Sequence, residues 1–156
     1  MSFKTHLDET DVQILHLLQN DGRITNAELA KRVGLSPPSV LQRVRALEKT
    51  GLIKGYVALL DPERLGLRIT ALVMISLSIH QEQPIERFRR AIQDIPEISE
   101  CYHVSGDFDF LLKVAVRDMR AYELFLREKL SKIKGIGKIT TNFVLATTKQ
   151  TTQVPL

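Results

Sequence analysis

The stretch GLSPPSVLQRVRALEKTGLI, residues 34–53, decides the fold of the N-terminal part of this chain. Ser36 is a favourable N-cap for a helix, and Pro37 follows it where the missing N–H costs nothing. Gly51 ends the helical pattern. Apolar residues recur at helical spacing and form one stripe: Val40, Val44 and Leu47. The stretch therefore predicts a short amphipathic helix, and its polar side is rich in basic residues.

The polar side of this helix has the residue types that read duplex DNA. A short helix fits the major groove, where Arg recognises guanine and Gln recognises adenine through paired hydrogen bonds. Residues near the start of such a helix reach base edges, and later or flanking residues contact phosphates. We therefore assign base contacts to Ser39, Gln42 and Arg43. We assign phosphate contacts to Arg45, Lys49, Lys54 and Arg23.

Charge is distributed unevenly along the chain, although the net charge of +4 is only mildly basic. Residues 1–21 contain one basic and four acidic residues, whereas residues 22–60 contain seven basic and two acidic ones. Such a basic segment is typical of a surface that binds a polyanion. The alternative is a solvated polar face on a three-helix packing module. Glu48 fits a DNA-binding face least well, and we expect it to pair with a basic neighbour.

Two further helices are expected before the quoted stretch. Asp8 can cap the first, and Thr25 to Glu28 has the spacing of a capping box that opens the second. Three short helices with a tight turn between the last two describe a helix-turn-helix. The charge distribution and this short turn favour DNA binding over the packing module. After the third helix, residues 53–60 are expected to form a strand or wing, and residues 63–68 a hinge.

The second half of the chain changes to strand periodicity, with apolar residues alternating from Ala71 to Ile79. The expected elements are, in order, a strand at 71–79, a helix at 84–95, strands at 98–104 and 110–116, a helix at 118–130 and a strand at 139–146. This order is that of the split βαβ, ferredoxin-like fold. We therefore expect an α+β chain, with a helix-turn-helix domain at 1–52, a connecting strand and hinge at 53–68 and a ferredoxin-like domain at 69–156.

Short motifs spread along the chain are shared, in one register, with a known family. They are residues 11–18, DGRITN at 21–26, LAKRVGLSP at 29–37, RVRALE at 43–48, GY at 55–56, VSGDFD at 104–109 and DMRAY at 118–122. With them the chain resembles the leucine-responsive regulatory (Lrp/AsnC, feast/famine) family of prokaryotic transcription regulators. The resemblance implies a DNA-binding N-terminal domain and a C-terminal domain that forms dimers through its sheets and assembles further, commonly to octamers.

The resemblance also implies an effector site, in which an amino acid binds between dimers and shifts their assembly and promoter occupancy. In this chain the corresponding loop runs from Ser105 to Asp109. Asp107 or Asp109 can hold an ammonium group, and backbone amides around Gly106 can approach a carboxylate because no side chain blocks them. Without the resemblance, a tight hairpin turn is the better-supported explanation of the same residues. The implied effector-binding residues are Ser105, Gly106, Asp107, Asp109, Met119 and Asn142.

Other chemistries have weaker support in the sequence. Cys101 and His103 alternate on one expected strand without a nearby third ligand, so we expect no metal site. No nucleophile accompanies Asp107 and Asp109, so we expect neither an enzyme nor a cofactor other than the amino-acid effector. One cysteine suits a reducing compartment, and no apolar run is long enough to span a membrane. The expected localisation is cytoplasmic and nucleoid-associated.

The main functional hypothesis is a sequence-specific regulator that binds double-stranded DNA, itself and a small amino acid. One alternative is an architectural protein that compacts DNA and ignores effectors. A further alternative is a small-molecule-binding module that regulates an enzyme and carries a vestigial helical domain. Binding to duplex DNA that weakens steeply with salt excludes this last alternative.

Overall fold

The computed structural model describes residues 7–78 and 82–156. Contacts divide the chain into two compact units. One comprises the residues up to Leu59 together with Lys149–Leu156, and the other comprises Leu60–Thr148. The chain therefore passes from one unit to the other twice. From the sequence we expected all of 69–156 to form one domain, but the contacts of the last eight residues place them with the N-terminal unit.

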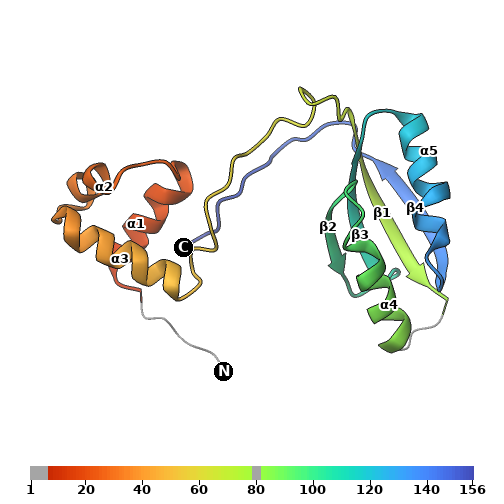
Figure 1. Cartoon of the computed structure of the whole chain (residues 1–156), viewed down its shortest axis with the longest axis horizontal. Helices are drawn as coiled ribbons and strands as arrows, with labels where there is room; N and C mark the ends of the chain where they lie inside the picture. The colour runs from red at the N-terminus through yellow and green to blue at the C-terminus, as the bar shows by residue number, and fades with distance from the viewer. Residues whose placement is uncertain (1–6, 79–81) are drawn as a thin grey trace. The chain divides into compact units, whose positions relative to one another are not determined.

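The N-terminal unit contains three helices: α1 (Glu9–Asn20), α2 (Asn26–Val33) and α3 (Pro37–Lys49) (Figure 1). Asp8, Thr25 and Ser36 cap them, each with a side-chain oxygen that accepts from the backbone N–H three residues later. Gly34 ends α2 in the left-handed conformation, at φ 70°, and turns the chain into α3. The buried core is Ile14, Leu15, Leu29, Ala30, Val40, Val44 and Leu47. The helix-turn-helix predicted from the sequence is confirmed.

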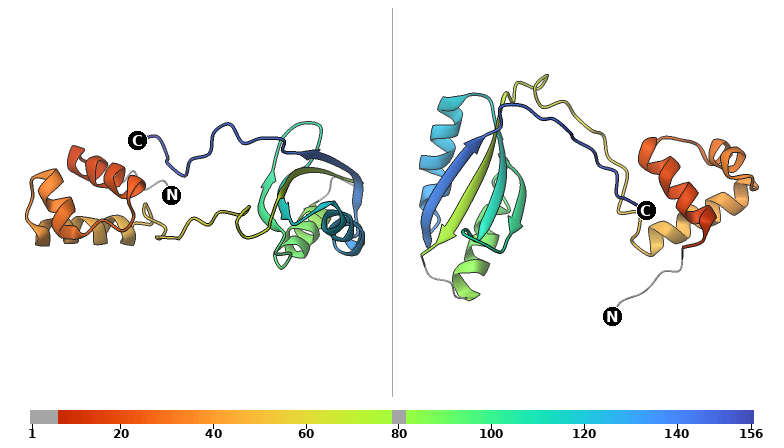
Figure 2. Two further views of the ribbon diagram at one scale, coloured as in Figure 1. Left: turned by 90° about the horizontal axis from the view of Figure 1, so that it is seen from above. Right: turned by 180° about the vertical axis from the view of Figure 1, so that it is seen from behind.

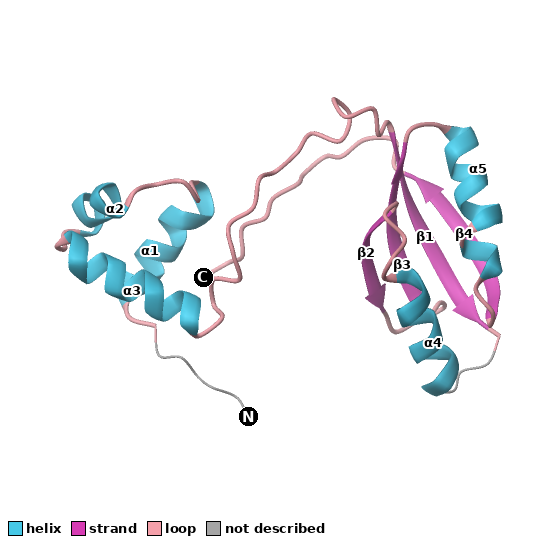
Figure 3. Ribbon diagram, in the orientation of Figure 1, coloured by secondary structure: helices cyan, strands magenta, loops and turns pink. Residues whose placement is uncertain are grey.

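The segment after α3 corrects one expectation. Residues 53–60, all of which the structure describes, contain no strand, and Figure 3 draws this segment as loop. Alternating apolar residues favour a strand only where a neighbouring strand supplies hydrogen-bond partners. This segment has no strand partner in the described chain, and its Val57 and Leu59 side chains are exposed.

The unit Leu60–Thr148 is a four-stranded antiparallel sheet with two main helices (Figure 1). Its elements are β1 (Ile69–Leu77), α4 (Glu82–Ile92), β2 (Ile98–His103), β3 (Phe110–Val116), α5 (Met119–Glu128), the short 3-10 helix Leu130–Lys132 and β4 (Ile136–Phe143). The strand order is β2-β3-β1-β4, and each neighbouring pair is antiparallel. This arrangement confirms the predicted α+β class and element order. The last strand begins and ends three residues earlier than expected, and Ile79, the expected end of the first strand, lies outside the described residues.

The core of this unit lies between the sheet and its helices, which cover the same face of the sheet (Figure 2). Ala71, Val73, Ile75 and Leu77 alternate along β1 and are buried, as the sequence periodicity predicted. Phe88 of α4, Phe125 of α5 and Phe110 of β3 complete this core. The opposite face of the sheet carries the intervening residues, which are half-buried or exposed; they include Leu72, Met74, Leu111 and Tyr102.

Candidate nucleic-acid interface and effector site

One side of α3 is buried and the opposite side faces solvent. Val40, Val44 and Leu47 pack in the helical core. Four of the predicted DNA-contacting residues are exposed and follow one another at helical spacing: Ser39, Gln42, Arg45 and Lys49. The remaining predicted phosphate contacts, Arg23 and Lys54, are also exposed.

The first turn of α3 is held by its cap. The Ser36 hydroxyl accepts from the Ser39 backbone N–H at 3.4 Å, and the two hydroxyls hydrogen-bond to each other at 2.8 Å. Pro37 and Pro38 occupy the next positions and restrict the backbone there. The cap and the two prolines therefore fix the direction in which α3 continues from the turn.

Arg43 lies apart from the other predicted DNA contacts. Its Nη1 donates to Asp8 Oδ2 and to Asp11 Oδ1, each at 2.7 Å, and its side chain is 34% exposed. The backbone N–H of Asp11 and then the Arg43 guanidinium hold the pKa of Asp8 below its ordinary value. Both carboxylates in turn raise the pKa of Arg43. Arg43 thus fastens α3 to the first turn of α1.

This contact was not predicted from the sequence. Asp8 and Asp11 were recognised only as residues of a helix start, a role that Asp8 does fill by accepting from the Asp11 N–H at 2.8 Å. Their link to Arg43 joins positions more than thirty residues apart. Local spacing carries no signal for such a pair.

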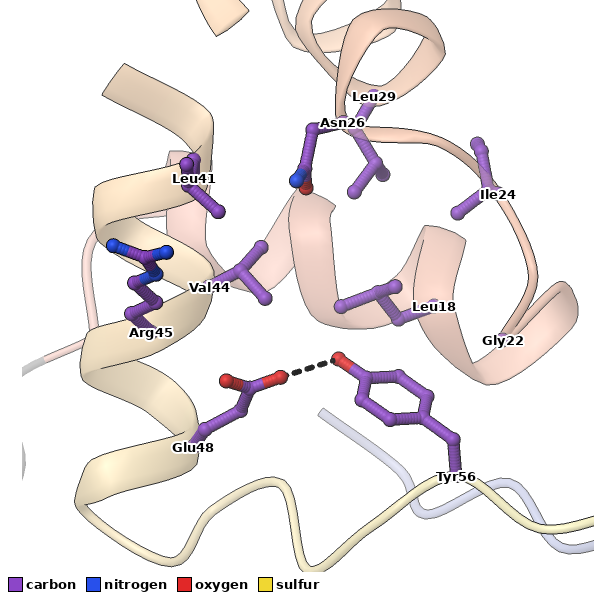
Figure 4. Close-up of a pocket in the computed structure, with 10 residues that line it drawn as sticks. All are labelled: Leu18, Gly22, Ile24, Asn26, Leu29, Leu41, Val44, Arg45, Glu48 and Tyr56. Atoms are coloured by element: carbon purple, nitrogen blue, oxygen red, sulfur yellow. Dashed lines mark hydrogen bonds between the residues drawn. The ribbon is translucent and has the colours of Figure 1, made fainter. Parts of the chain in front are cut away.

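A hollow of about 200 Å³ lies between the three helices and the start of the linker, the connecting segment at residues 53–68 (Figure 4). Tyr56 closes one side of it, and its hydroxyl donates to Glu48 Oε1 at 3.1 Å. Partial burial and the neighbouring carboxylate raise the pKa of Tyr56. We expected Glu48 to pair with a basic neighbour, but it accepts a hydrogen bond from Tyr56, which lies in the segment after α3. The linker is fixed to the end of the α3 helix at this point.

The predicted effector loop is bound to the end of β1. The Asp109 backbone N–H donates to the Ile75 carbonyl at 2.8 Å, and its Oδ2 accepts from the Leu77 N–H at 2.7 Å. Gly106 has a φ of 128°, a conformation that side chains disfavour, and this allows the sharp turn. Ser105, Gly106 and Asp107 are exposed. Asp109 therefore shapes the loop, whereas the Asp107 carboxylate faces solvent.

The other two predicted effector residues lie at different places along β1. Met119 opens α5 directly after β3, whose last residue Val116 pairs with Ile69 at the beginning of β1. Asn142 pairs with Leu72, and its Nδ2 contacts Met74 Sδ at 4.0 Å. The loop contacts the far end of β1, and this nine-residue strand spans ~27 Å. One chain therefore does not bring all six predicted effector residues to one small ligand.

No three His, Cys, Asp or Glu side chains among the described residues lie close enough together to hold a metal ion. None of the described helices is long and apolar enough to cross a membrane.

A capped helix-turn-helix with an exposed polar recognition face, joined to a separate ferredoxin-like domain, defines a DNA-binding transcription regulator rather than an enzyme. The Lrp/AsnC ligand binding domain matches residues 70–154, and the winged helix-turn-helix DNA-binding domain matches residues 7–54. The chain belongs to the Lrp/AsnC family. This confirms the predicted family, the fold class, the regulatory function and the absence of an enzymatic role.

Relatives extend the match over almost the whole chain. The leucine-responsive regulatory protein of Salmonella typhimurium is 47% identical over 148 residues, which cover 95% of this chain and 90% of the relative. A transcriptional regulator of Neisseria meningitidis, solved in complex with L-Met, superposes with a TM-score of 0.92 at 37% identity and covers 96% of this chain and 97% of that one. Escherichia coli AsnC superposes with a TM-score of 0.89 at 27% identity and covers 96% and 99%.

Proposed function

We propose that this regulator reads a specific DNA sequence with α3 and that an amino-acid effector changes its assembly and its occupancy of DNA. The observation that carries the DNA part is the exposed side of α3, opposite a fully packed apolar stripe. The effector part is supported by the match to a ligand-binding domain and by the similar regulator solved with L-Met. Association with chromosomal DNA, and hence with the nucleoid, follows from this function.

Within the interface, Ser39 and Gln42 contact base edges, because they lie on the exposed side of the first turns of α3. Arg45, Lys49, Lys54 and Arg23 contact phosphates. Arg43, assigned to bases from the sequence, reaches a base only by giving up Asp8 and Asp11. We therefore assign it a second role, in which it holds α3 at a fixed angle to α1.

The test compares affinity for the selected operator with affinity for random DNA. Gln42→Ala is expected to cost about 1–3 kcal/mol on the operator and little on random DNA. Lys49→Ala is expected to weaken both alike and to reduce the salt dependence by about one phosphate contact. Gln13→Ala, an exposed glutamine on α1, is the matched control. If Gln42→Ala weakens operator and random DNA equally, α3 is not the reading element.

The effector site is completed by a second copy of the chain. The loop from Ser105 to Asp109 and Met119 lie toward opposite ends of β1, and Asn142 lies between them, beside Leu72. A small zwitterion therefore bridges the loop and Met119 only if different copies supply them. The exposed Asp107 carboxylate suits its ammonium group. Dimers form through the open sheet face that carries Leu72, Met74, Leu111 and Tyr102, and these dimers assemble further, to octamers or a similar assembly.

Calorimetry with the twenty amino acids, followed by sedimentation with each binder, tests this part. At least one amino acid is expected to release or absorb heat and to change the sedimentation coefficient. Asp107→Asn is expected to remove the heat without unfolding the chain, because the Asp107 side chain is exposed. If no amino acid gives heat or alters assembly, the effector-independent architectural alternative replaces this proposal.

A further inference from the structure

The C-terminal segment Lys149–Leu156 docks on the end of α1. The Gln19 carboxamide contacts both backbone polar groups of Val154: Nε2 donates to the Val154 carbonyl at 3.2 Å, and Oε1 accepts from the Val154 N–H at 2.5 Å. These two hydrogen bonds copy the pattern by which one strand residue recognises another. A carboxamide is the side chain that can do so, because it combines a donor and an acceptor in one plane.

A second carboxamide pair reinforces the first. Gln153 Nε2 donates to Asn20 Oδ1 at 2.7 Å. Asn20 is itself held in place, because its Nδ2 donates to the His16 carbonyl at 2.8 Å and so turns Oδ1 toward the tail. Gln19 and Asn20 together therefore form a polar docking site for an extended peptide at the last turn of α1.

The apolar side chains of the tail contribute less to this contact. Val154 and Leu156 remain 63% and 51% exposed, so docking depends mainly on hydrogen bonds that water can replace. Such a contact is weak by itself. Covalent attachment of the tail to the same chain makes the contact intramolecular, and an intramolecular contact persists at a lower intrinsic affinity than one between separate molecules.

We infer that residues 149–156 act as a releasable tether: docked on Gln19 and Asn20, they restrict how the DNA-binding unit can turn relative to the unit Leu60–Thr148. The chain passes between the two units twice. With the tail docked both connections constrain the units, and with the tail released only the linker does. This role rests on the proposed function in DNA binding, whereas the docking itself does not.

The docking is tested by solvent exchange of the Val154 amide, measured by NMR on the full-length protein. Gln19→Ala is expected to accelerate this exchange about tenfold, because the bond that shields the amide is lost. Gln19→Glu keeps the acceptor but loses the donor to the Val154 carbonyl, so an intermediate rate is expected. Gln13→Ala, on the same helix, is the control and is expected to change nothing. Equal exchange in Gln19→Ala and the unmodified chain overturns the docking site.

A mixing experiment determines which copy supplies the site. Isotope-labelled unmodified chains are refolded with an excess of unlabelled Gln19→Ala chains, and only the labelled tails are observed. Retained protection of Val154 supports docking within one chain. Loss of protection assigns the tail to another copy and overturns the tether as stated.

The restraint is tested with DNA that carries two half-sites at graded spacings. The unmodified protein is expected to prefer one spacing, and both Gln19→Ala and a chain ending at Thr148 are expected to flatten that preference at least threefold. If exchange accelerates but the spacing preference is unchanged, the tail docks without restraining the unit, and the tether is overturned. If the unmodified protein binds no DNA at any spacing, the proposed function fails, while the exchange result still judges the docking.

Discussion

The core of the unit Leu60–Thr148, the sheet unit, contains large aromatic side chains. The core of the N-terminal unit with α1, α2 and α3, the three-helix unit, is entirely aliphatic among the described residues. In the first of these cores Phe88 and Phe110 lie with ring centroids 4.5 Å apart, and Tyr122 and Phe125 pack nearby. In the three-helix unit the elements at the edges are joined by polar contacts instead: Arg43 with Asp8 and Asp11, Tyr56 with Glu48, and Gln19 with Val154. Polar contacts in the sheet unit, such as Lys129 with Glu97, add to a core that packs without them.

This difference shows how a small DNA-binding module gains order that its core alone does not provide. Short helices bury little apolar surface, and a small unit gains correspondingly little stability from burial. Hydrogen bonds and ion pairs at its edges fix angles and positions, although each contributes little free energy at the surface. We therefore expect core substitutions to have the largest effects on the stability of the sheet unit. In the three-helix unit, we expect backbone and polar substitutions to have measurable effects on stability.

The largest effect is expected for Phe110→Ala. Phe110 is 1% exposed, and its loss leaves a cavity beside Phe88 that costs about 3–5 kcal/mol of unfolding free energy. Denaturant unfolding followed by residue-resolved NMR is expected to show the sheet unit unfolding earlier while the three helices keep their midpoint. Leu145→Ala, at a 98% exposed position, is the control and is expected to change neither transition. If both units shift together after Phe110→Ala, they form one cooperative unit and the comparison fails.

A smaller effect, confined to the other unit, is expected for Gly34→Ala. Nothing lies within 4 Å of the added Cβ, but Gly34 has a φ of 70°, so the cost of about 1–2 kcal/mol comes from the left-handed backbone alone. Thermal unfolding monitored at α2 and α3 is expected to shift to lower temperature. Gly22→Ala is the matched control, because its φ is not positive and its added Cβ meets Tyr56 at an ordinary distance of 3.4 Å. Equal stability of Gly34→Ala and Gly22→Ala would show that this turn tolerates a side chain.

The same contrast explains how far the sequence predicts this molecule. Among the described residues, periodicity identified the five α-helices and all four strands of the sheet, because burial of one face imposes a regular spacing on residues such as Val73 and Val44. It did not identify the short 3-10 helix Leu130–Lys132. Residues 53–60 were expected to form a strand or wing, and the strand alternative was wrong, because a strand needs a partner that the pattern does not specify. The docking of the last eight residues was missed as well, since Gln153 and Val154 carry no periodic signal.

The candidate sites divide in the same way. The exposed side of α3 follows from its apolar side, so Gln42 and Lys49 could be placed from the sequence. The engagement of Arg43 with α1 could not, because it depends on how two helices pack. The separation of Met119 from Asp109 follows only from the pairing of β1 with β3. Contacts between distant parts of the chain are thus the part that local patterns leave open.

A smaller effect again is expected for Tyr56→Phe. This variant keeps the ring against the hollow and removes only the hydrogen bond to Glu48. Because Tyr56 is half-exposed, we expect the loss of unfolding free energy to be at most about 1 kcal/mol. The measurement is the unfolding free energy of the three-helix unit, together with amide exchange in residues 54–58. Tyr102→Phe is the matched control in the sheet unit, where Tyr102 donates to Glu100. If Tyr102→Phe destabilises its unit more, polar contacts matter no more in the small unit than in the large one.

The smallest expected effect is the acid response of the contact between Asp8 and Arg43. The pKa of Asp8 is below its ordinary value in the folded state, so the carboxylate stabilises the three-helix unit at pH values above 3.8, the unfolded value. This stabilisation is lost as the pH falls through the lower folded value. Asp8→Asn is expected to remove this step from the acid unfolding curve of α1, while the curve of the sheet unit stays the same. Glu128→Gln, at an ion-paired residue of α5 whose pKa is also lowered, is the control and is expected to alter only the sheet unit. An unchanged acid step in Asp8→Asn would mean that Asp11 alone holds Arg43, and that the α1 cap adds nothing to the fastening of α3.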